Sequence, residues 1–235
     1  MTLRAWLRLF AAGLILGFCY AGFSIARLWG SEMRWVQRFL HAIGYLLGLR
    51  VTIEGHPGRS HVLYVANHIS WLDILAVGGE TQVRFIAKDD IAGWPMVGAL
   101  ARLAGTIFVS RERRAATRIQ ADTVLDALKG GRPVMLFAEG GIGDGSIVRP
   151  FRPALFASAV EAAMPVQPVA IDYGPGRMDY AWPPNTSFSQ EAKRMLNRAG
   201  TVPVALRFLS PLDAHTLDRK ALAIRSQAAI ADALT

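Results

Sequence analysis

A histidine and an aspartate five positions apart are the first residues in this sequence that could do chemistry together. His68 follows the apolar run 62–66, and Asp73 lies in the next stretch, which has a helical pattern. Residues five apart point about 140° away from each other on a regular helix, so the two meet only if His68 precedes the helix and Asp73 lies in its first turn. A carboxylate bonded to one ring nitrogen fixes the tautomer of a histidine. The spacing therefore indicates a histidine base with an orienting carboxylate.

The same segment also fits a purely structural use. Ser70 and Asp73 have the spacing of a capping box, in which Ser70 is the helix N-cap and Asp73, at the third helical position, satisfies backbone amides. A zinc site is disfavoured because the sequence has no H-E-x-x-H and no second His or Cys at ligand spacing. The absence of G-x-S-x-G disfavours a serine hydrolase. Spacing alone leaves catalysis and capping both open.

A second cluster ends in an arginine. Arg111 comes directly after the apolar run 106–109, and Ser110 could cap the helix that follows. A guanidinium and the free amides of a helix start could then meet at one anion. The alternative is an arginine that faces solvent from a first helical turn.

The third cluster is rich in glycine. Four glycines lie within six residues after Glu139, and glycine lets the backbone approach a ligand closely. The segment is not a Walker A loop, because Gly-Lys-Ser/Thr is absent, and Ser146 stands where a dinucleotide fingerprint needs a glycine-like residue. Arg149 and Arg152 add positive charge near Glu139. Alone, the segment is equally typical of a turn.

These clusters need a fold that brings strand ends together. From residue 49 onward, short apolar runs alternate with helical patterns, which predicts an α/β fold with a largely parallel sheet flanked by helices. In such sheets the chemistry collects at the carboxyl ends of the strands. The predicted strands are 50–53, 62–66, 83–87, 106–109, 133–137, 166–171 and 202–208. The predicted helices are 71–78, 94–103, 112–129, 154–163 and 216–233, and 174–189 is expected to be a long loop.

Residues 1–48 are predicted to form two helices that associate with a membrane, ahead of one α/β domain at 49–235. The 18 residues 9–26 carry no charge and would span about 27 Å as a helix, close to the ~30 Å hydrocarbon layer. Residues 31–48 have an amphipathic pattern, and arginines and tryptophans flank both helices. A half-inserted or hairpin anchor fits these features. A signal peptide, and a second helix that only packs on the domain, remain alternatives.

Composition narrows the classes of partner. The net charge is +8, and residues 1–50 contribute +5 of it, from six arginines and one glutamate. No RNP, helix-turn-helix or zinc-finger signature accompanies this charge, so we expect a membrane or acidic partner and no nucleic acid. The single cysteine, Cys19, excludes an intramolecular disulfide and a zinc site built on paired thiolates.

Taken together, the order and spacing of the clusters resemble the lysophospholipid acyltransferase family over roughly residues 50–175. The matching blocks are Asn67-His68-x4-Asp73, Gly105-x-Ile107-Phe108-Val109-x-Arg111, Phe137-x-Glu139-Gly140 and Pro165-Val166-x-Pro168-Val169. The N-terminal helices are also similar to the membrane anchor common in that family.

The resemblance implies a role for each residue. His68 would be the general base and Asp73 its orienting carboxylate. Asn67, Arg111, Glu139, Gly140, Gly141, Arg149 and Arg152 would bind the acceptor. An acyl-ACP or acyl-CoA thioester would be the co-substrate of a lyso-lipid acceptor, with no metal or other cofactor. The enzyme would lie at the inner (cytoplasmic) membrane, its catalytic domain facing the cytoplasm.

The third block departs from the family pattern. Ala138 replaces the usual Pro, Gly141 the usual Thr, and Ile142 the Arg or Ser often found next. The longer run through Arg152 is more similar to the subgroup that acylates lyso-ornithine lipid, a zwitterionic amino-acid lipid, than to enzymes that acylate 1-acylglycerol-3-phosphate. An acyl thioesterase and a non-catalytic membrane lipid-binding protein are the alternative functions.

Overall fold

A seven-stranded sheet organises the molecule. The computed structural model describes residues 1–109 and 114–235, and within these ranges the strand order is β1-β7-β6-β2-β5-β3-β4. The strands are β1 (Leu49–Gly55), β2 (Leu63–Ala66), β3 (Arg84–Lys88), β4 (Ile107–Val109), β5 (Val134–Phe137), β6 (Val166–Asp172) and β7 (Val202–Phe208). Each predicted strand overlaps one of these.

Most neighbouring strands run parallel, as the alternating pattern predicts. β6, β2, β5, β3 and β4 all point the same way, and β1 pairs parallel with β7. β6 and β7 pair antiparallel. Because β2 lies between β5 and β6, the segments that follow these three strands emerge side by side at one edge of the sheet.

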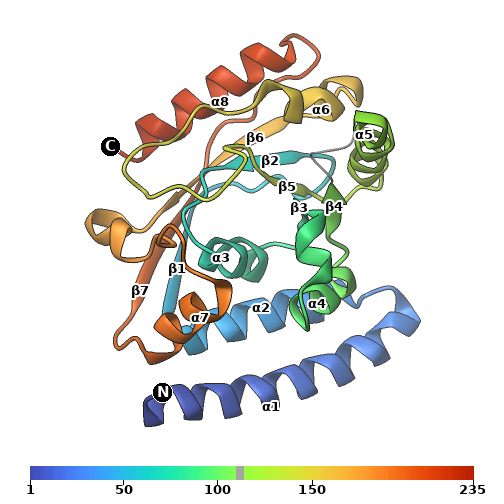
Figure 1. Ribbon diagram of the computed structural model, residues 1–235. Helices are drawn as coiled ribbons and strands as arrows, with labels where there is room; N and C mark the ends of the chain where they lie inside the picture. The colour runs from blue at the N-terminus through green and yellow to red at the C-terminus, as the bar shows by residue number, and fades with distance from the viewer. Residues whose placement is uncertain (110–113) are drawn as a thin grey trace.

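Helices cover both faces of the sheet. Figure 1 shows α5 (Arg114–Lys129), α6 (Ala157–Glu161) and α8 (Arg219–Ala233) over one face, and α2 (Met33–Leu47) and α3 (Leu72–Glu80) over the other. Side chains of the central strands alternate between two buried clusters, one on each face of the sheet: in β2, Leu63 and Val65 belong to one cluster, and Tyr64 and Ala66 to the other. Burial on both faces explains the continuous apolar runs of the central strands.

The two N-terminal helices lie in different surroundings. α2 packs on α3, and its Leu47 is part of the buried core, so this helix packs on the α/β domain. α1 (Leu3–Ala26) lies outside α2 (Figure 1) and exposes many apolar side chains, including Trp6, Phe10 and Leu14. Together with the short 3-10 helix Arg27–Trp29, α1 is long and apolar enough to cross a membrane.

α1 is also tied to the C-terminal end of α7 (Phe188–Asn197). The guanidinium of Arg8 donates hydrogen bonds to the main-chain oxygens of Met195, Leu196 and Arg198, at 3.2, 3.0 and 2.7 Å. These are carbonyl groups at the end of a helix, where the partial charge is negative and a cation is favourable. Arg8 therefore fixes the start of α1 against the domain.

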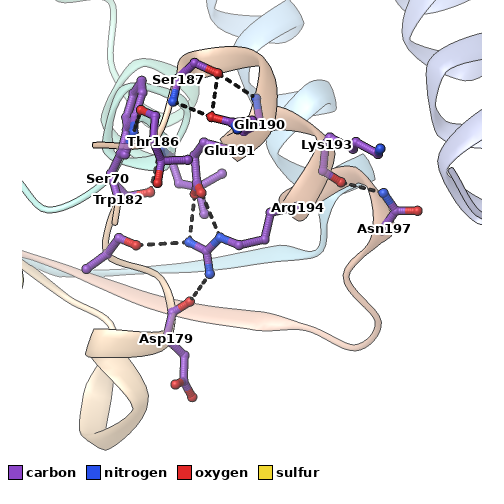
Figure 2. A network of polar contacts seen from close by, with 12 residues as sticks. Ser70, Asp179, Trp182, Thr186, Ser187, Gln190, Glu191, Lys193, Arg194 and Asn197 are labelled. Atoms are coloured by element: carbon purple, nitrogen blue, oxygen red, sulfur yellow. Dashed lines mark hydrogen bonds and ion pairs between the residues drawn. The ribbon is translucent and has the colours of Figure 1, made fainter. Parts of the chain in front are cut away.

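α7 is an element that the sequence analysis did not predict. The expected loop 174–189 contains a 3-10 helix at Gly174–Asp179, and α7 begins at Phe188, near the end of that loop. A capping box between Ser187 and Gln190 starts α7. Figure 2 shows Arg194 of α7 bonded to the buried carboxylate of Glu191 and to the main chain of Asp179, so the helix holds the preceding segment in place.

Two predicted helices are shorter than expected, and each α-helix is preceded by a 3-10 helix. The predicted helix 94–103 is α4 (Val97–Leu103), preceded by the 3-10 helix Asp89–Gly93. The predicted helix 154–163 consists of the 3-10 helix Pro153–Phe156 followed by α6.

Candidate active site

The site is built on the corner between β2 and α3, and Asn67 fixes the chain that enters it. The Asn67 amide donates to the main-chain oxygen of Ile171 at 3.0 Å, and its side-chain oxygen accepts from the Ile171 N–H at 2.9 Å. These two bonds continue the pairing of β2 with β6 past the end of β2. Both ends of this buried amide are occupied, so Asn67 holds the chain just before His68.

His68 and Asp73 meet as the spacing predicts. Nδ1 of His68 lies 2.7 Å from Oδ2 of Asp73, whose side chain is fully buried. The same oxygen accepts the N–H groups of Ile69 and Ser70, at 2.9 and 3.0 Å. One carboxylate therefore bonds the imidazole and also accepts from the amides before the helix. The contacts needed for orienting His68 and the contacts needed for capping are both present.

The start of α3 differs in detail from the expected capping box. α3 begins at Leu72 with Trp71 at the N-cap position, which places Asp73 second in the helix. Ser70 lies one residue further out, and its hydroxyl accepts from the Leu72 N–H at 3.4 Å. The Ser70 N–H donates to Oδ2 of Asp73, which is the bond that Asp73 contributes to a capping box.

Asp73 has a further partner that the sequence analysis missed. The hydroxyl of Tyr173 donates to Oδ1 of Asp73 at 2.5 Å. Tyr173 is buried, and burial, together with the neighbouring Asp73 carboxylate, raises its pKa well above 10. Its position just after the predicted strand 166–171 was the only signal in the sequence that could have identified it.

The imidazole of His68 is held on its face as well as its edge. It stacks on Phe137, with ring centroids 3.9 Å apart and planes 13° from parallel. The side chain is 12% exposed, and within the part of the chain that the structure describes no hydrogen bond reaches Nε2. Nε2 is thus the ring nitrogen that a substrate could approach.

The glycine-rich loop is hydrogen-bonded to the main chain of His68. Oε1 of Glu139 accepts from the His68 N–H at 2.9 Å, and the His68 oxygen accepts from the Gly143 N–H at 2.6 Å. Oε2 of Glu139 pairs with Nε of Arg149 at 2.9 Å, and Arg149 also donates to the Gly141 oxygen at 2.5 Å. The Glu139 side chain is only 1% exposed. Its carboxylate therefore holds the residue that carries the imidazole.

Two arginines lie on the exposed side of this loop. Gly140 has a φ of +79°, and a Cβ there would lie 2.5 Å from Nε of Arg152, so only glycine lets this guanidinium lie against the backbone. Arg152 is exposed, and the Arg149 side chain is 41% exposed. Arg111, the remaining candidate, is outside the described residues.

Comparisons with known proteins identify the family of the chain. A family model described as "Acyltransferase" matches residues 49–172. The chain is 33% identical over 204 residues to the lyso-ornithine lipid O-acyltransferase of Pseudomonas aeruginosa, covering 85% of this chain and 76% of that one. It is 37% identical over 214 residues to the Brucella abortus enzyme of the same name, covering 83% and 79%.

Other relatives carry a different name. Identity to the 1-acyl-sn-glycerol-3-phosphate acyltransferase of Neisseria meningitidis is 38% over 134 residues, or 55% of this chain and 52% of that one. The crystal structure of the 1-acyl-sn-glycerophosphate acyltransferase from Thermotoga maritima superposes with a TM-score of 0.72 at 24% identity, covering 98% and 93% of the two chains. That likeness shows a shared fold.

Proposed function

Because the chain belongs to the acyltransferase family, we propose that it moves a fatty acyl chain from a thioester donor to the hydroxyl of a lyso-lipid, with His68 as the general base. The observation that carries this proposal is the 2.7 Å bond between Nδ1 of His68 and the buried Asp73. It fixes the tautomer of the ring and leaves Nε2 to receive a proton.

The proposed reaction needs no covalent enzyme intermediate. The acceptor hydroxyl gives its proton to Nε2 of His68 while its oxygen forms a bond to the thioester carbonyl carbon. When the tetrahedral intermediate collapses, the carbon–sulfur bond breaks, and the protonated His68 returns the proton to the departing sulfur. Asp73 stays ionised and holds the imidazolium in place. General-base catalysis of this kind contributes about 10²- to 10⁴-fold to the rate.

The charges of the glycine-rich loop favour a lyso-ornithine lipid as acceptor. Its zwitterionic head group needs partners of both signs, and the loop offers Arg149 and Arg152 together with Asp144. The exposed Asp144 accepts from the hydroxyl and the N–H of Ser146, at 2.6 and 2.9 Å, which lowers its pKa and keeps it anionic. The adjacent Gly143 donates its N–H to the His68 oxygen, which supports a place for Asp144 near the acceptor. A phosphate acceptor would need the cations alone.

The membrane is the proposed location of the reaction, because the acceptor and the product are lipids. Support comes from α1, whose outer surface exposes a continuous set of large apolar side chains. Arg4, Arg27, Arg34 and Arg38 flank that helix and suit anionic head groups. An acyl carrier protein or coenzyme A thioester would be presented from the cytoplasmic side of the inner membrane.

A product assay tests the proposal. Membranes containing the protein are incubated with a labelled acyl thioester and a panel of lyso-lipids, and products are identified by mass. We expect acylated ornithine lipid, and at least a hundredfold loss of it in His68→Ala. Release of free fatty acid without lipid product would favour a thioesterase. Full activity of His68→Ala would contradict the assigned base.

A further inference from the structure

We propose that Tyr173 is a positioning residue that acts through Asp73, by holding the carboxylate in the one orientation that serves His68. This inference rests on the proposed function and adds a residue to its machinery. Tyr173 lies more than a hundred positions from His68 in the sequence, and none of the four motif blocks includes it.

The two oxygens of Asp73 have different partners. Oδ2 accepts three bonds, from Nδ1 of His68 and from the N–H groups of Ile69 and Ser70. Within the described residues, Oδ1 accepts one bond, from the Tyr173 hydroxyl. Because the Asp73 side chain is fully buried, removal of that hydroxyl would leave Oδ1 without a donor from the protein and with little access to water. The carboxylate would then gain by rotating, and rotation would break the bond to His68.

The hydroxyl is held in place by the strand it follows. Tyr173 comes directly after β6, and the Ile171 main chain two residues earlier is clamped by Asn67. The corner that carries His68 is therefore joined to the end of β6 twice, through Asn67 and through Asp73. The raised pKa of Tyr173 means that its hydroxyl keeps its proton, and remains a donor, at the pH of any ordinary assay.

The neighbouring Tyr180 supplies a matched control. Its ring lies 5.4 Å from that of Tyr173, and it is also buried. Its hydroxyl accepts from the guanidinium of Arg198 at 3.0 Å, and no bond joins it to Asp73. Tyr180→Phe therefore removes the hydroxyl of another buried tyrosine without touching the carboxylate.

The first test compares Tyr173→Phe with Tyr180→Phe in the full chain, in detergent–lipid micelles. We expect kcat of Tyr173→Phe to fall about ten- to hundredfold, the size expected for a hydrogen bond to a charged group, with unchanged KM for donor and acceptor. Tyr180→Phe should keep kcat within about twofold. Activity is expressed per folded molecule, with the folded fraction read from tryptophan fluorescence. A purely structural role would change the folded fraction and leave kcat per folded molecule intact.

Two replacements of similar size at position 173 separate the effect of the hydrogen-bond donor from the effect of packing. 4-Aminophenylalanine at position 173 keeps an N–H donor where the hydroxyl was, and 4-fluorophenylalanine fills the same space without a donor. The first should restore most of kcat and the second should match Tyr173→Phe. Equal activity of the two, or a Tyr173→Phe kcat within about twofold of the native value, would overturn the proposal.

A double variant shows whether Tyr173 acts through Asp73. Adding Tyr173→Phe to Asp73→Asn should cause little further loss of kcat, because the carboxylate it positions is already gone. If the fold losses of kcat in the two single variants multiply in the double variant, Tyr173 does not act through Asp73. If His68→Ala and Asp73→Asn were themselves fully active, the proposed function would fail, and that outcome differs from a failure of Tyr173 alone.

Discussion

The carboxylate of Glu139 accepts a hydrogen bond from the main-chain N–H of His68 at 2.9 Å. Glu139 lies in the glycine-rich loop that follows β5, the strand next to β2. His68, the proposed base, is thus held by two carboxylates from different segments: Asp73 at the ring and Glu139 at the backbone. A glutamate that family resemblance assigns to the acceptor site is, in this geometry, fully occupied by the protein. Its contact with an acceptor would run through its partner Arg149.

This relationship predicts an effect of Arg149 on stability. Arg149→Leu leaves one oxygen of the buried Glu139 unpaired, so we expect a loss of about 1–3 kcal/mol in the free energy of unfolding. Glu139→Gln combined with Arg149→Leu should recover part of the loss, because no charge is then left buried. Thermal unfolding of the solubilised protein measures both.

A second ion pair provides the control for activity. Arg194 pairs with the buried Glu191 in α7, with a similarly exposed guanidinium. Arg194→Leu should destabilise the protein to a similar extent and keep kcat, whereas Arg149→Leu should also lower kcat/KM for the acceptor. Equal effects of the two variants on kcat/KM would argue against a role for Arg149 in acceptor binding.

Asp73→Asn separates catalysis from capping. The amide keeps a short polar side chain in the first turn of α3 but removes the charge that stabilises the imidazolium, so we expect turnover to fall by about 10²-fold or more and stability to change little. Asp218→Asn is the matched control, because Asp218 caps α8 through the Ala221 N–H at 2.7 Å, in another part of the fold. Steady-state kinetics at saturating substrate measure the difference. Native turnover in Asp73→Asn would leave Asp73 with capping alone.

Asp144→Asn should change which acceptor is preferred. Asparagine can accept the same two bonds from Ser146, so the turn is kept and only the charge is lost. We expect kcat/KM for lyso-ornithine lipid to fall roughly tenfold, the worth of one charge-assisted contact, and kcat/KM for 1-acylglycerol-3-phosphate to stay level or rise.

Asp213 offers the control for Asp144→Asn. It accepts the His215 N–H in a turn of the same kind, at 2.9 Å, outside the loop described above. Asp213→Asn should leave the ratio of the two acceptors unchanged. A ratio that is equally unchanged in Asp144→Asn would remove Asp144 from the acceptor site.

Charges on the outer surface of α1 should weaken membrane binding. Phe10 and Leu14 are 69% and 61% exposed, and replacing both with Asp would oppose insertion by roughly 3–4 kcal/mol each at the centre of the hydrocarbon layer. Flotation with vesicles that contain anionic lipid measures the bound fraction. Ile224→Asp is the control, because Ile224 is exposed on α8, on the opposite side of the sheet. Undiminished flotation of the α1 variant would exclude this surface as the anchor.

Stability should decline at alkaline pH because of buried tyrosines. Burial raises the pKa of Tyr64 from 10 to about 12. The unfolded chain releases this proton near pH 10 while the folded protein keeps it, so the free energy of unfolding is at its full value below pH 10 and falls as the pH rises towards 12. The loss from Tyr64 is at most roughly 3 kcal/mol. Denaturant titrations across this range should show a smaller decline in Tyr64→Phe, and parallel curves would contradict the assignment.

The sequence predicted the parts of the site that depend on local spacing. His68 and Asp73 lie on either side of one strand-to-helix corner, so their meeting follows from helix geometry. Tyr173 was missed because its position depends on β6 lying beside β2, and strand order is set by long-range pairing that one sequence does not reveal. The orientation of Glu139 was missed for the same reason: its partner is the backbone of a residue on another strand.

In the sheet and the helices, too, features set by local sequence were predicted and features set by long-range pairing were not. Short runs rich in β-forming residues, several of them continuously apolar, predicted a strand at each place where the structure has one, but nothing in β7 indicates that it runs antiparallel to β6. α7 was missed because Pro183, Pro184 and Asn185 are strong turn formers and hid the capping box at Ser187. Phe188, the first residue of that helix, packs edge-on against Trp71, at 5.7 Å, beside the corner that carries His68.

The bonds from Arg8 to the end of α7 have a practical consequence for preparing the enzyme. A truncation that removes α1 in search of a water-soluble variant would strip three terminal carbonyls of their donor and loosen the last turn of the helix whose first residue supports Trp71. The intact chain in mild detergent keeps that link, so turnover numbers should be measured on this form.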